Sequence, residues 1–362
     1  MSRQAFEKKE LISSHYSDAK LSSVELLDNR RRFIMKTVNK RLQLHERIFS
    51  TGRMYTSEVA YLTSRRDVFE NAGIRIPCCC HADALHSRLT GEIQTTVLME
   101  DLGDLKIHAV CELLTDARIS LVLWKIATFH GTNWGDVESK RVHFYERIVI
   151  GSKNPWVPYL YRKSFAVKRF MRCWGSDDAF ANMDVPTSLK AFYSSFPVAK
   201  ILTLLKKQLS ANGDLPPQTL IHGDLHGGNL AFTEEDVVMF DFQFTGSGRV
   251  SCEIAYLMVM AYEYRGREAE DTMLRVYHEH LSMDKTSIIK YEWSEFIRDY
   301  DAVLKHWAAH IVLTMCYYTP SRVLAAKANT AGMLCKNLLL LSRLLRRLSD
   351  RLRFNQPTDS ST

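Results

Sequence analysis

Apolar residues in the first hundred positions recur with the short periods of β-strands, with one helical stretch among them. Residues 21–27 and 33–38 are rich in β-forming residues, and turn-forming residues 28–30 lie between them, so we predict a β-hairpin. Residues 56–72 carry apolar side chains at helical spacing and are followed by Gly73, a common helix terminator. This part of the chain is therefore expected to combine strands with a single helix.

Beyond this helix the pattern returns to strands and then becomes helical. Residues 79–85 and 95–102 predict two more strands, and Gly103 ends the β-rich part. From there to residue 354 the apolar period is mostly helical, with one interruption. That interruption, TLIHGDLHGGNLAFTEEDVVMFDFQF over residues 219–244, predicts a strand, a glycine-rich loop and a β-hairpin. The whole pattern is typical of an α+β protein.

The chain length agrees with two structural units. The chain has 362 residues, 46% apolar and 25% charged, which is the composition of a globular protein with about two domains or lobes. We expect a small β-rich N-terminal lobe over residues 1–102, a larger, mostly helical C-terminal lobe over residues 103–354, and a disordered tail over residues 355–362. The longest stretch without a charged residue, 306–321, has sixteen residues, whereas spanning a bilayer takes about 20.

The net charge of +7 is concentrated near the C-terminus. Residues 336–353 contain six basic residues and Asp350, a net charge of +5, so the rest of the chain is nearly neutral and we expect no nucleic-acid partner. Leucines recur at helical spacing in this segment, which predicts an amphipathic basic helix. We expect its basic face to be solvated while its apolar face packs on the protein. The alternative is weak contact of the basic face with a membrane or a partner protein.

Cysteine usage and the N-terminal residues bear on the cellular compartment. The eight cysteines lack the spacing of a disulfide-rich domain, and the sequence contains no Asn-x-Ser/Thr sequon. The first residues, MSRQAFEKKE, include no apolar stretch of the kind found in a secretory signal. We therefore expect a cytoplasmic protein.

The predicted hairpin brings two oxygen-bearing side chains together. If its turn is centred on Glu235, then Asn229 and Asp241 lie six residues to either side and face each other, with Cβ atoms about 5 Å apart. Amide and carboxylate oxygens at that separation suit Mg²⁺, which takes few protein ligands. Asp224 lies five residues before Asn229, on the glycine-rich loop. Kinases use this arrangement to combine a base for the attacking hydroxyl with two metal ligands.

Two segments carry a resemblance to a known group of enzymes. HGDLHGGNL over residues 222–230, followed by MFDFQ over residues 239–243, resembles the signature of the aminoglycoside and choline kinase-like phosphotransferases, including the branch similar to ecdysteroid kinases. The resemblance implies a two-lobed protein kinase-like fold. It also implies transfer of a phosphoryl group from ATP, with Mg²⁺, to a hydroxyl of a small molecule.

The resemblance further implies roles for residues of the N-terminal lobe. The segment FIMK, which ends at Lys36, resembles the strand whose lysine binds the α- and β-phosphates of ATP. SEVAY resembles the helix that supplies the glutamate partner of this lysine, here Glu58. VLMEDL resembles the hinge strand whose backbone binds adenine, which implies nucleotide contacts at Glu100 and Leu102.

In the C-terminal lobe the resemblance implies the catalytic and metal-binding residues. Asp224 would accept or orient the proton of the substrate hydroxyl. Asn229 and Asp241 would hold Mg²⁺, which neutralises charge on the transferred phosphoryl group. His222 would brace the loop rather than take part in the chemistry. Glu253 stands where these enzymes usually have an aspartate, in the helix after the DFQ segment.

Two other functional classes stay open. A catalytically weak or inactive pseudokinase, acting as a binding or scaffold protein, is favoured by the glycine-poor sequence SSHYSDAK, residues 13–20, at the position of the loop over the phosphates. A protein kinase is less compatible, because HGD and DFQ stand where HRD and DFG would be and no APE element follows. Sterol-like, choline-like and aminoglycoside-like acceptors all fit the sequence, and we expect the acceptor pocket around residues 142–182 and 256–318.

Three segments with histidine or cysteine are not expected to bind zinc. His222 and His226 lie on a loop rather than on one face of a helix, and residues 278–280 lack the HExxH spacing. Neighbouring side chains of residues 78–81 point to opposite faces of a strand and cannot converge on one ion. We expect the three cysteines of this segment to be buried thiols.

Overall fold

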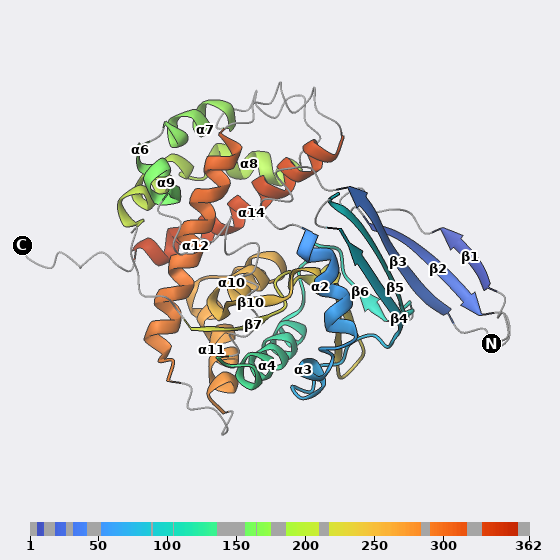
Figure 1. The fold of residues 1–362 in the computed structure, drawn as a ribbon. Coiled ribbons are helices and arrows are strands. Elements are labelled where there is room, and N and C mark those ends of the chain that lie inside the picture. The colour runs from blue at the N-terminus through green and yellow to red at the C-terminus, as the bar shows by residue number, and fades with distance from the viewer. Residues whose placement is uncertain are drawn as a thin grey trace, which may run out of the picture.

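The structure, a computed structural model, describes residues 6–10, 19–26, 32–41, 52–87, 90–103, 105–135, 156–163, 165–174, 186–209, 217–283, 290–316 and 328–353. Figure 1 shows a sheet on one side of the molecule and most of the helices gathered on the other. The sheet has the strand order β1-β2-β3-β5-β4, and every pair is antiparallel. Its strands are β1 (Phe6–Glu10), β2 (Ala19–Leu26), β3 (Arg32–Arg41), β4 (Cys79–His86) and β5 (Glu92–Glu100). An N-terminal antiparallel sheet followed by a largely helical part confirms the predicted α+β, protein kinase-like fold.

The predicted β-hairpin forms from β2 and β3. Val24 lies opposite Phe33, and Leu21 lies opposite Lys36. On the other side of β3, Val97 of β5 lies opposite Lys36, so Lys36 occupies a strand that is paired on both sides. Buried residues alternate with less buried ones along β5, the period expected when one face of a sheet packs on the protein. The two strands predicted over residues 79–102 correspond to β4 and β5.

The single helix predicted over residues 56–72 is wrong, because the structure has two. α2 spans Gly52–Leu62 and α3 spans Asp67–Glu70. At the end of α2 the Thr63 hydroxyl donates to the carbonyl four residues earlier at 2.7 Å, and the Thr63 N–H bonds to the carbonyl three residues earlier. The Arg65 N–H bonds to the Ala60 carbonyl, five residues earlier, so the i to i−4 backbone bonds of the helix stop here. Gly73 ends the segment as predicted, with a φ of 64°.

The prediction that the thiols of Cys78, Cys79 and Cys80 are buried is also wrong. Cys78 and Cys80 are exposed and Cys79 is half-buried. The pairing of β4 with β5 shifts between Cys79 and His81, so Cys80 is the extra residue of a β-bulge. β4 is an edge strand of the sheet, a place where such bulges are common.

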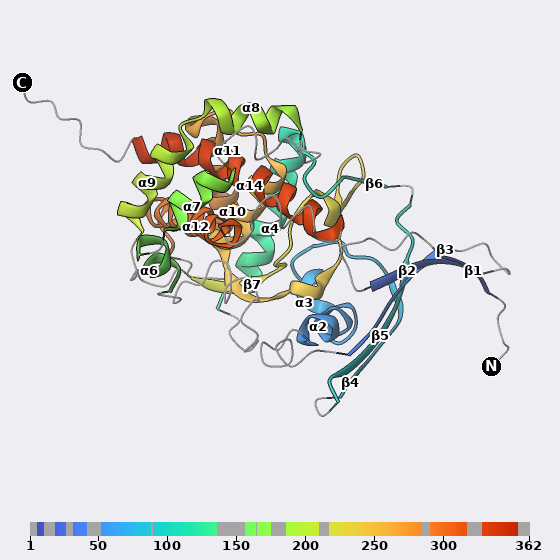
Figure 2. The ribbon, with the colours of Figure 1, turned by 90° about the horizontal axis from the view of Figure 1, so that it is seen from above.

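The helical part is built around α10, in which every residue except Tyr256 is buried. Figure 2, seen from above, shows these helices clustered beside the sheet. The long helices α12 and α14 pack on α10, and α4 packs against α11. The helices are α4 (Asp116–Thr132), α6 (Trp156–Lys163), α7 (Ala166–Trp174), α8 (Thr187–Ser195), α9 (Val198–Gln208), α10 (Val250–Ala261), α11 (Arg267–Met283), α12 (Trp293–Met315) and α14 (Ala328–Arg353).

Short strands lie between these helices and carry the glycine-rich loop. They are β6 (Lys106–Ile107), β7 (Gln218–Ile221), β8 (Leu230–Phe232), β9 (Val237–Met239) and β10 (Gly246–Arg249). β8 and β9 form the predicted hairpin, but its register differs from the prediction by one residue. Leu230 lies opposite Met239, and the N–H of Phe240 donates to the Asn229 carbonyl at 3.2 Å. Phe240, rather than Asp241, therefore lies opposite Asn229.

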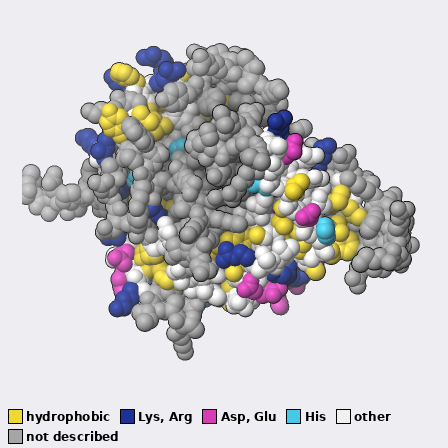
Figure 3. All heavy atoms as spheres, viewed as in Figure 1, with side chains coloured by type: hydrophobic (Ala, Val, Ile, Leu, Met, Phe, Trp, Pro, Cys, Tyr) yellow, Lys and Arg dark blue, Asp and Glu magenta, His cyan; other side chains and the backbone are white. Residues whose placement is uncertain are grey.

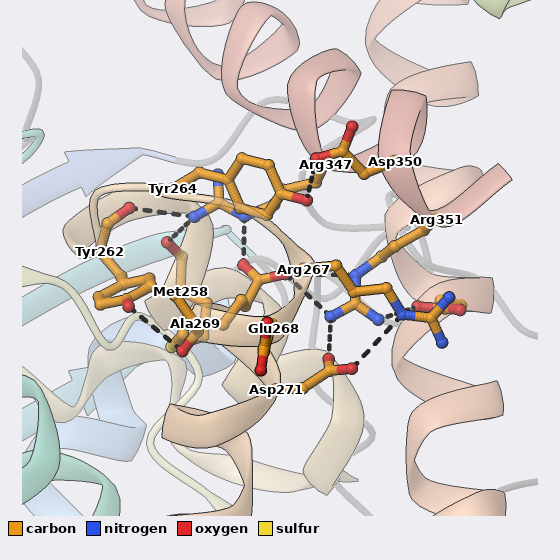
Figure 4. A network of polar contacts seen from close by, with 12 residues as sticks. Met258, Tyr262, Tyr264, Arg267, Glu268, Ala269, Asp271, Arg347, Asp350 and Arg351 are labelled. Carbon is orange, nitrogen blue, oxygen red and sulfur yellow. Dashed lines mark hydrogen bonds and ion pairs between the residues drawn. The ribbon is translucent and has the colours of Figure 1, made fainter. Parts of the chain in front are cut away.

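The C-terminal helix α14 lacks the solvated basic face predicted for it. Arg347 and Arg351 are 0% and 1% exposed, and Arg343 is half-buried. Figure 4 shows that the Arg347 and Arg351 side chains point into the protein, toward acidic and carbonyl oxygens of neighbouring helices. Of the basic residues predicted to form the face, Arg346 is the one whose side chain is exposed among those described. The sequence pattern of this helix cannot predict that acidic side chains of other helices pair with its arginines.

Figure 3 shows small apolar patches separated by basic and acidic side chains over the described part of one face. Among the helices that the structure describes, none is both long enough and apolar enough to cross a membrane.

Candidate active site

Lys36 lies in a buried cluster of charges. Its Nζ is 2.7 Å from Oε2 of Glu58 and 2.8 Å from Oδ1 of Asp241. Glu58 belongs to α2, whereas Asp241 follows β9 and is 205 positions from Lys36 in the sequence. Burial alone would lower the pKa of Lys36, but the two carboxylates outweigh burial and raise the pKa above its ordinary value. Lys36 is therefore held as a cation where the sheet meets the helical part.

Asp241 reaches Lys36 through an unusual backbone conformation. Its φ and ψ are 64° and 65°, and among the described residues it is the one non-glycine residue with a positive φ. Aspartate adopts this left-handed conformation more readily than most residues, but it remains uncommon. The conformation turns the chain at the end of the hairpin and directs the carboxylate toward Lys36. Such conformations gather at functional sites, where the surrounding structure holds them.

The glycine-rich loop holds Asp224 and Asn229 together. Nδ2 of Asn229 donates to the Asp224 carbonyl at 2.8 Å and lies 3.4 Å from Oδ2 of the same residue. The Tyr256 hydroxyl donates to Oδ1 of Asp224 at 2.8 Å. Nε2 of His226 is 3.7 Å from that oxygen, which is too far for a hydrogen bond. The Asp224 carboxylate is therefore anchored mainly through Oδ1.

His222 and Glu253 hold the backbone of this loop. Nδ1 of His222 accepts the N–H of Asp224 at 3.3 Å, and Nε2 donates to the Phe240 carbonyl at 3.0 Å. The ring thus ties the loop to the end of the hairpin, which is the bracing role expected for it. Glu253 accepts the N–H groups of His222 at 3.0 Å and of Gly223 at 2.6 Å. From its position in α10, the Glu253 side chain is therefore long enough to accept hydrogen bonds from two backbone N–H groups of the loop.

Two glycines of the loop are packed too closely for a side chain, Gly227 against residues 108–109 and Gly228 against His226 of the loop itself. A Cβ placed on Gly227 would lie 3.1 Å from Cβ of His108 and 3.4 Å from the carbonyl oxygen of Ala109. A Cβ on Gly228 would lie 3.0 Å from the His226 ring. These glycines are required for space rather than for a positive φ.

Glu253 also ends a buried chain of polar groups. Nε2 of His130 lies 2.9 Å from Oε2 of Glu253, and Nδ1 of His130 lies 2.7 Å from the Tyr277 hydroxyl. Burial alone would raise the pKa of Glu253, but hydrogen bonds from His130 and from the Gly223 N–H outweigh burial and lower the pKa. The ionised carboxylate is the form that the folded protein favours.

Replacing Glu253 by glutamine should destabilise the protein in a pH-dependent way. The amide NH₂ would face donors that need an acceptor, so we expect a loss of about 3 kcal/mol of unfolding free energy at pH 7. Because the native pKa of Glu253 lies below its ordinary value near 4.5, this stability is present above that pH and is lost as the pH falls through the native pKa. The difference between wild type and E253Q in urea unfolding should therefore shrink below about pH 4.5. A difference that stays constant with pH would contradict the ionised state of Glu253.

Glu100 and Leu102 lie at the end of β5, where the chain leaves the sheet. The Glu100 carboxylate accepts the N–H of Cys78 at 3.1 Å, so its side chain is already engaged. The Leu102 carbonyl accepts the N–H of Leu105 at 2.8 Å. The N–H of Leu102 has no acceptor among the described residues.

Asn229 and Asp241 offer the oxygen donors that Mg²⁺ prefers. Because Nδ2 of Asn229 faces Asp224, the Oδ1 atom of this amide is directed elsewhere. Asp241 binds Lys36 through Oδ1, which leaves Oδ2 for a cation. One amide and one carboxylate oxygen match the one or two protein ligands that Mg²⁺ usually takes. The donor set therefore fits this ion.

Comparison with known proteins identifies the family. Residues 19–291 match the model of the ecdysteroid kinase-like family, which is most of the chain. The chain belongs to the ecdysteroid kinase-like family. This is the branch that the resemblance in the sequence implied.

Individual relatives of this ecdysteroid kinase-like protein are distant. It is 28% identical over 104 residues to the thiamine kinases of Salmonella heidelberg and Salmonella typhimurium; the match covers 25% of this chain and only 38% of theirs. A choline kinase structure from Cryptosporidium parvum shares 13% identity, with coverage of 96% of this chain and 90% of that chain and a TM-score of 0.47. For an ethanolamine kinase from Plasmodium vivax the values are 11% identity, 93% and 82% coverage and a TM-score of 0.44.

The structure brings some of the predicted site residues of this family member together and leaves others outside the described chain. Lys36, Glu58 and Asp241 form one cluster, and Asp224 lies with Asn229 in a second. The expected phosphate loop lies outside the described residues apart from its last two positions, and so does much of the expected acceptor segment over residues 142–182.

The sequence pattern missed Tyr256 as a contact of Asp224. Its one signal was a spacing of three residues from Glu253 on a predicted helix.

Proposed function

We propose that this ecdysteroid kinase-like protein is an ATP- and Mg²⁺-dependent phosphotransferase that transfers the γ-phosphoryl group of ATP to a hydroxyl of a small molecule. The observation that carries the proposal is the convergence of Glu58 and Asp241 on Lys36, with Asp241 one residue beyond the backbone contact between Phe240 and Asn229. Adjoining segments then carry a cation for phosphate (Lys36), oxygen donors for a metal ion (Asn229 and Asp241) and a carboxylate that can accept a proton (Asp224). These are the parts that phosphoryl transfer needs.

Each side chain has a proposed role in the reaction. Lys36, oriented by Glu58, binds the phosphates of ATP, while the backbone at Glu100 and Leu102 binds adenine. Asp224 accepts the proton of the acceptor hydroxyl while the hydroxyl oxygen forms its bond to the γ-phosphorus and the bond to ADP breaks. Asn229 and Asp241 would hold Mg²⁺, which would supply neutralisation of charge on the phosphoryl group.

Nucleotide binding can be tested before any acceptor is known. Ligand at a hundredfold its dissociation constant should stabilise the folded protein by about 2.7 kcal/mol, so unfolding should shift to a higher temperature with Mg-ATP. In Lys36→Met this nucleotide-dependent shift should be lost. The matched control is Lys125→Met, because Lys125 also pairs with an aspartate, Asp236, at 2.9 Å, but at the turn end of the hairpin. Absence of a shift in the wild type would contradict the proposal and favour a scaffold protein without turnover.

The acceptor can be sought by measuring ADP release with a library of hydroxyl-bearing metabolites. Release that requires both Mg²⁺ and one class of small molecule is the expected result. Phosphate incorporation into added proteins, with no small molecule accepting it, would contradict the assignment to small-molecule substrates.

A further inference from the structure

Helix α10 contacts the glycine-rich loop through two side chains one helical turn apart. Glu253 and Tyr256 are separated by three positions, so they project from neighbouring points on one side of the helix. Glu253 accepts the backbone N–H groups of His222 and Gly223, whereas Tyr256 donates its hydroxyl to the side chain of Asp224. One residue of α10 therefore holds the backbone of the loop, and the other holds its carboxylate.

The Tyr256 ring is itself fixed in place. It stacks on the ring of Trp307 from α12, with centroids 5.5 Å apart and planes inclined by 25°. The His226 ring lies on another side, with its centroid 6.3 Å away. Trp307 is 5% exposed, so the surface on which Tyr256 rests is part of the packed interior. A phenol held in this way presents its hydroxyl from one direction.

The two oxygens of Asp224 are held unequally. Oδ1 accepts the hydrogen bond from Tyr256 at 2.8 Å, a short bond to a charged acceptor. Oδ2 has a single contact in the described chain, the 3.4 Å approach of Nδ2 of Asn229, whose stronger bond goes to the Asp224 carbonyl at 2.8 Å. Without the phenol, rotation of the carboxylate about its terminal bond would cost little, since such torsions are broad.

We propose that Tyr256 is a positioning residue for phosphoryl transfer. Its hydroxyl fixes Oδ1 of Asp224 so that Oδ2 faces the acceptor hydroxyl. The proposal rests on the assignment of Asp224 as the base in the proposed function. A misplacement of about 1 Å in a reacting group costs on the order of 100-fold in rate, so orientation of this carboxylate matters.

Tyr256→Phe tests the proposal, because it removes the hydroxyl and keeps the ring that stacks on Trp307. With the acceptor found in the metabolite screen, or with water as acceptor in Mg-ATP hydrolysis, kcat should fall about 10- to 100-fold while KM for ATP is unchanged. The matched control is Tyr264→Phe. The Tyr264 hydroxyl donates to the carboxylate of Asp350 in α14 at 2.8 Å, which is the same kind of bond, at the same length, as that from Tyr256 to Asp224. Its kcat should stay within about twofold of wild type.

A double-mutant cycle separates positioning from general damage to the fold. If Tyr256 acts through Asp224, then Tyr256→Phe should cause no further loss of rate when Asp224 is already asparagine. An equal loss in both backgrounds, or a wild-type rate for Tyr256→Phe, would overturn the proposal.

A readout that needs no substrate completes the test. Amide hydrogen exchange over residues 222–229 should be faster in Tyr256→Phe than in wild type or Tyr264→Phe, because the loop loses an anchor. Unchanged exchange in this segment would count against the positioning role. If the wild type transferred phosphate to no acceptor, including water, the proposed function would fail, while the exchange result would still decide whether Tyr256 holds the loop.

Discussion

Replacing Asp224 by asparagine should reduce phosphoryl transfer by about 10²- to 10⁴-fold, the contribution typical of a general base. Asparagine has nearly the shape of aspartate, and its carbonyl oxygen can still accept the hydrogen bond that Tyr256 donates to Oδ1 at 2.8 Å. What it lacks is the negative charge and the capacity to take a proton. The loss should therefore appear in kcat, with KM for ATP little changed. The measurement is Mg-ATP-dependent ADP release with the acceptor identified in the screen.

The specificity of this effect is checked by the same chemical change elsewhere. Asp236→Asn alters the aspartate that pairs with Lys125 at the turn of the hairpin, away from the loop that carries Asp224. Its kcat should remain within about twofold of wild type. Mg-ADP should bind D224N as tightly as wild type, since Lys36 and Asp241 are untouched. Wild-type kcat for D224N with an identified acceptor would contradict the assignment of the base.

Replacing Glu270 by glutamine should destabilise the protein by about 3–5 kcal/mol, because it leaves the buried Arg347 without its carboxylate partner. Oε1 of Glu270 lies 2.6 Å from Nε of Arg347, and Oε2 lies 3.0 Å from Nη2 of Arg351. All three side chains are at most 1% exposed. Figure 4 shows Arg347 and Arg351 of α14 beside Met258 of α10 and Asp271 of α11. Urea unfolding at pH 7 gives the change in free energy.

Other contacts of the two arginines explain why the loss should be large. Arg347 donates to the carbonyls of Met258 at 2.8 Å and Tyr262 at 3.0 Å, at the C-terminal end of α10. Arg351 binds Asp301 of α12 at 2.7 Å. With Glu270 neutralised, Arg351 keeps Asp271 and Asp301, but Arg347 stays buried without the one carboxylate that pairs with it in the described chain.

The matched control for Glu270 lies two residues earlier on the same helix. Glu268→Gln makes the same chemical change at an exposed position and should alter the unfolding free energy by less than about 0.5 kcal/mol. If E270Q lost no more unfolding free energy than E268Q, the negative charge of Glu270 in the buried network would add no stability.

Local patterns in the sequence were sufficient for the fold class, because they depend on neighbouring residues. The β-rich run over residues 95–102 and the turn composition of residues 28–30 predicted strands that the structure contains. The predictions failed at two interruptions of regular structure, one in a helix and one in a strand. The helical segment breaks between Leu62 and Asp67, and the bulge at Cys80 accompanies exposed thiols on an edge strand. Neither feature has a period that a pattern can reveal.

Spacing within one segment likewise identified candidate residues of the site. The five-residue interval from Asp224 to Asn229 is set by one loop, so the two residues meet as expected. The hairpin register was missed by one residue, because counting from a turn cannot detect how the turn is built. The left-handed backbone of Asp241 then directs its carboxylate to Lys36, an outcome that counting along the strands did not contain.

Contacts between distant elements were decided by packing alone. Lys36 and Asp241 are 205 positions apart, and Tyr256 meets Asp224 across 32. The arginines of α14 have the same sequence pattern whether water or carboxylates surround them. Their burial depends on acidic side chains and helix ends that other helices supply. Periodicity along the chain therefore determined which elements form and which residues were candidates for chemistry, while three-dimensional packing determined which charges are buried together, because the free energy of a buried charge depends on partners remote in sequence.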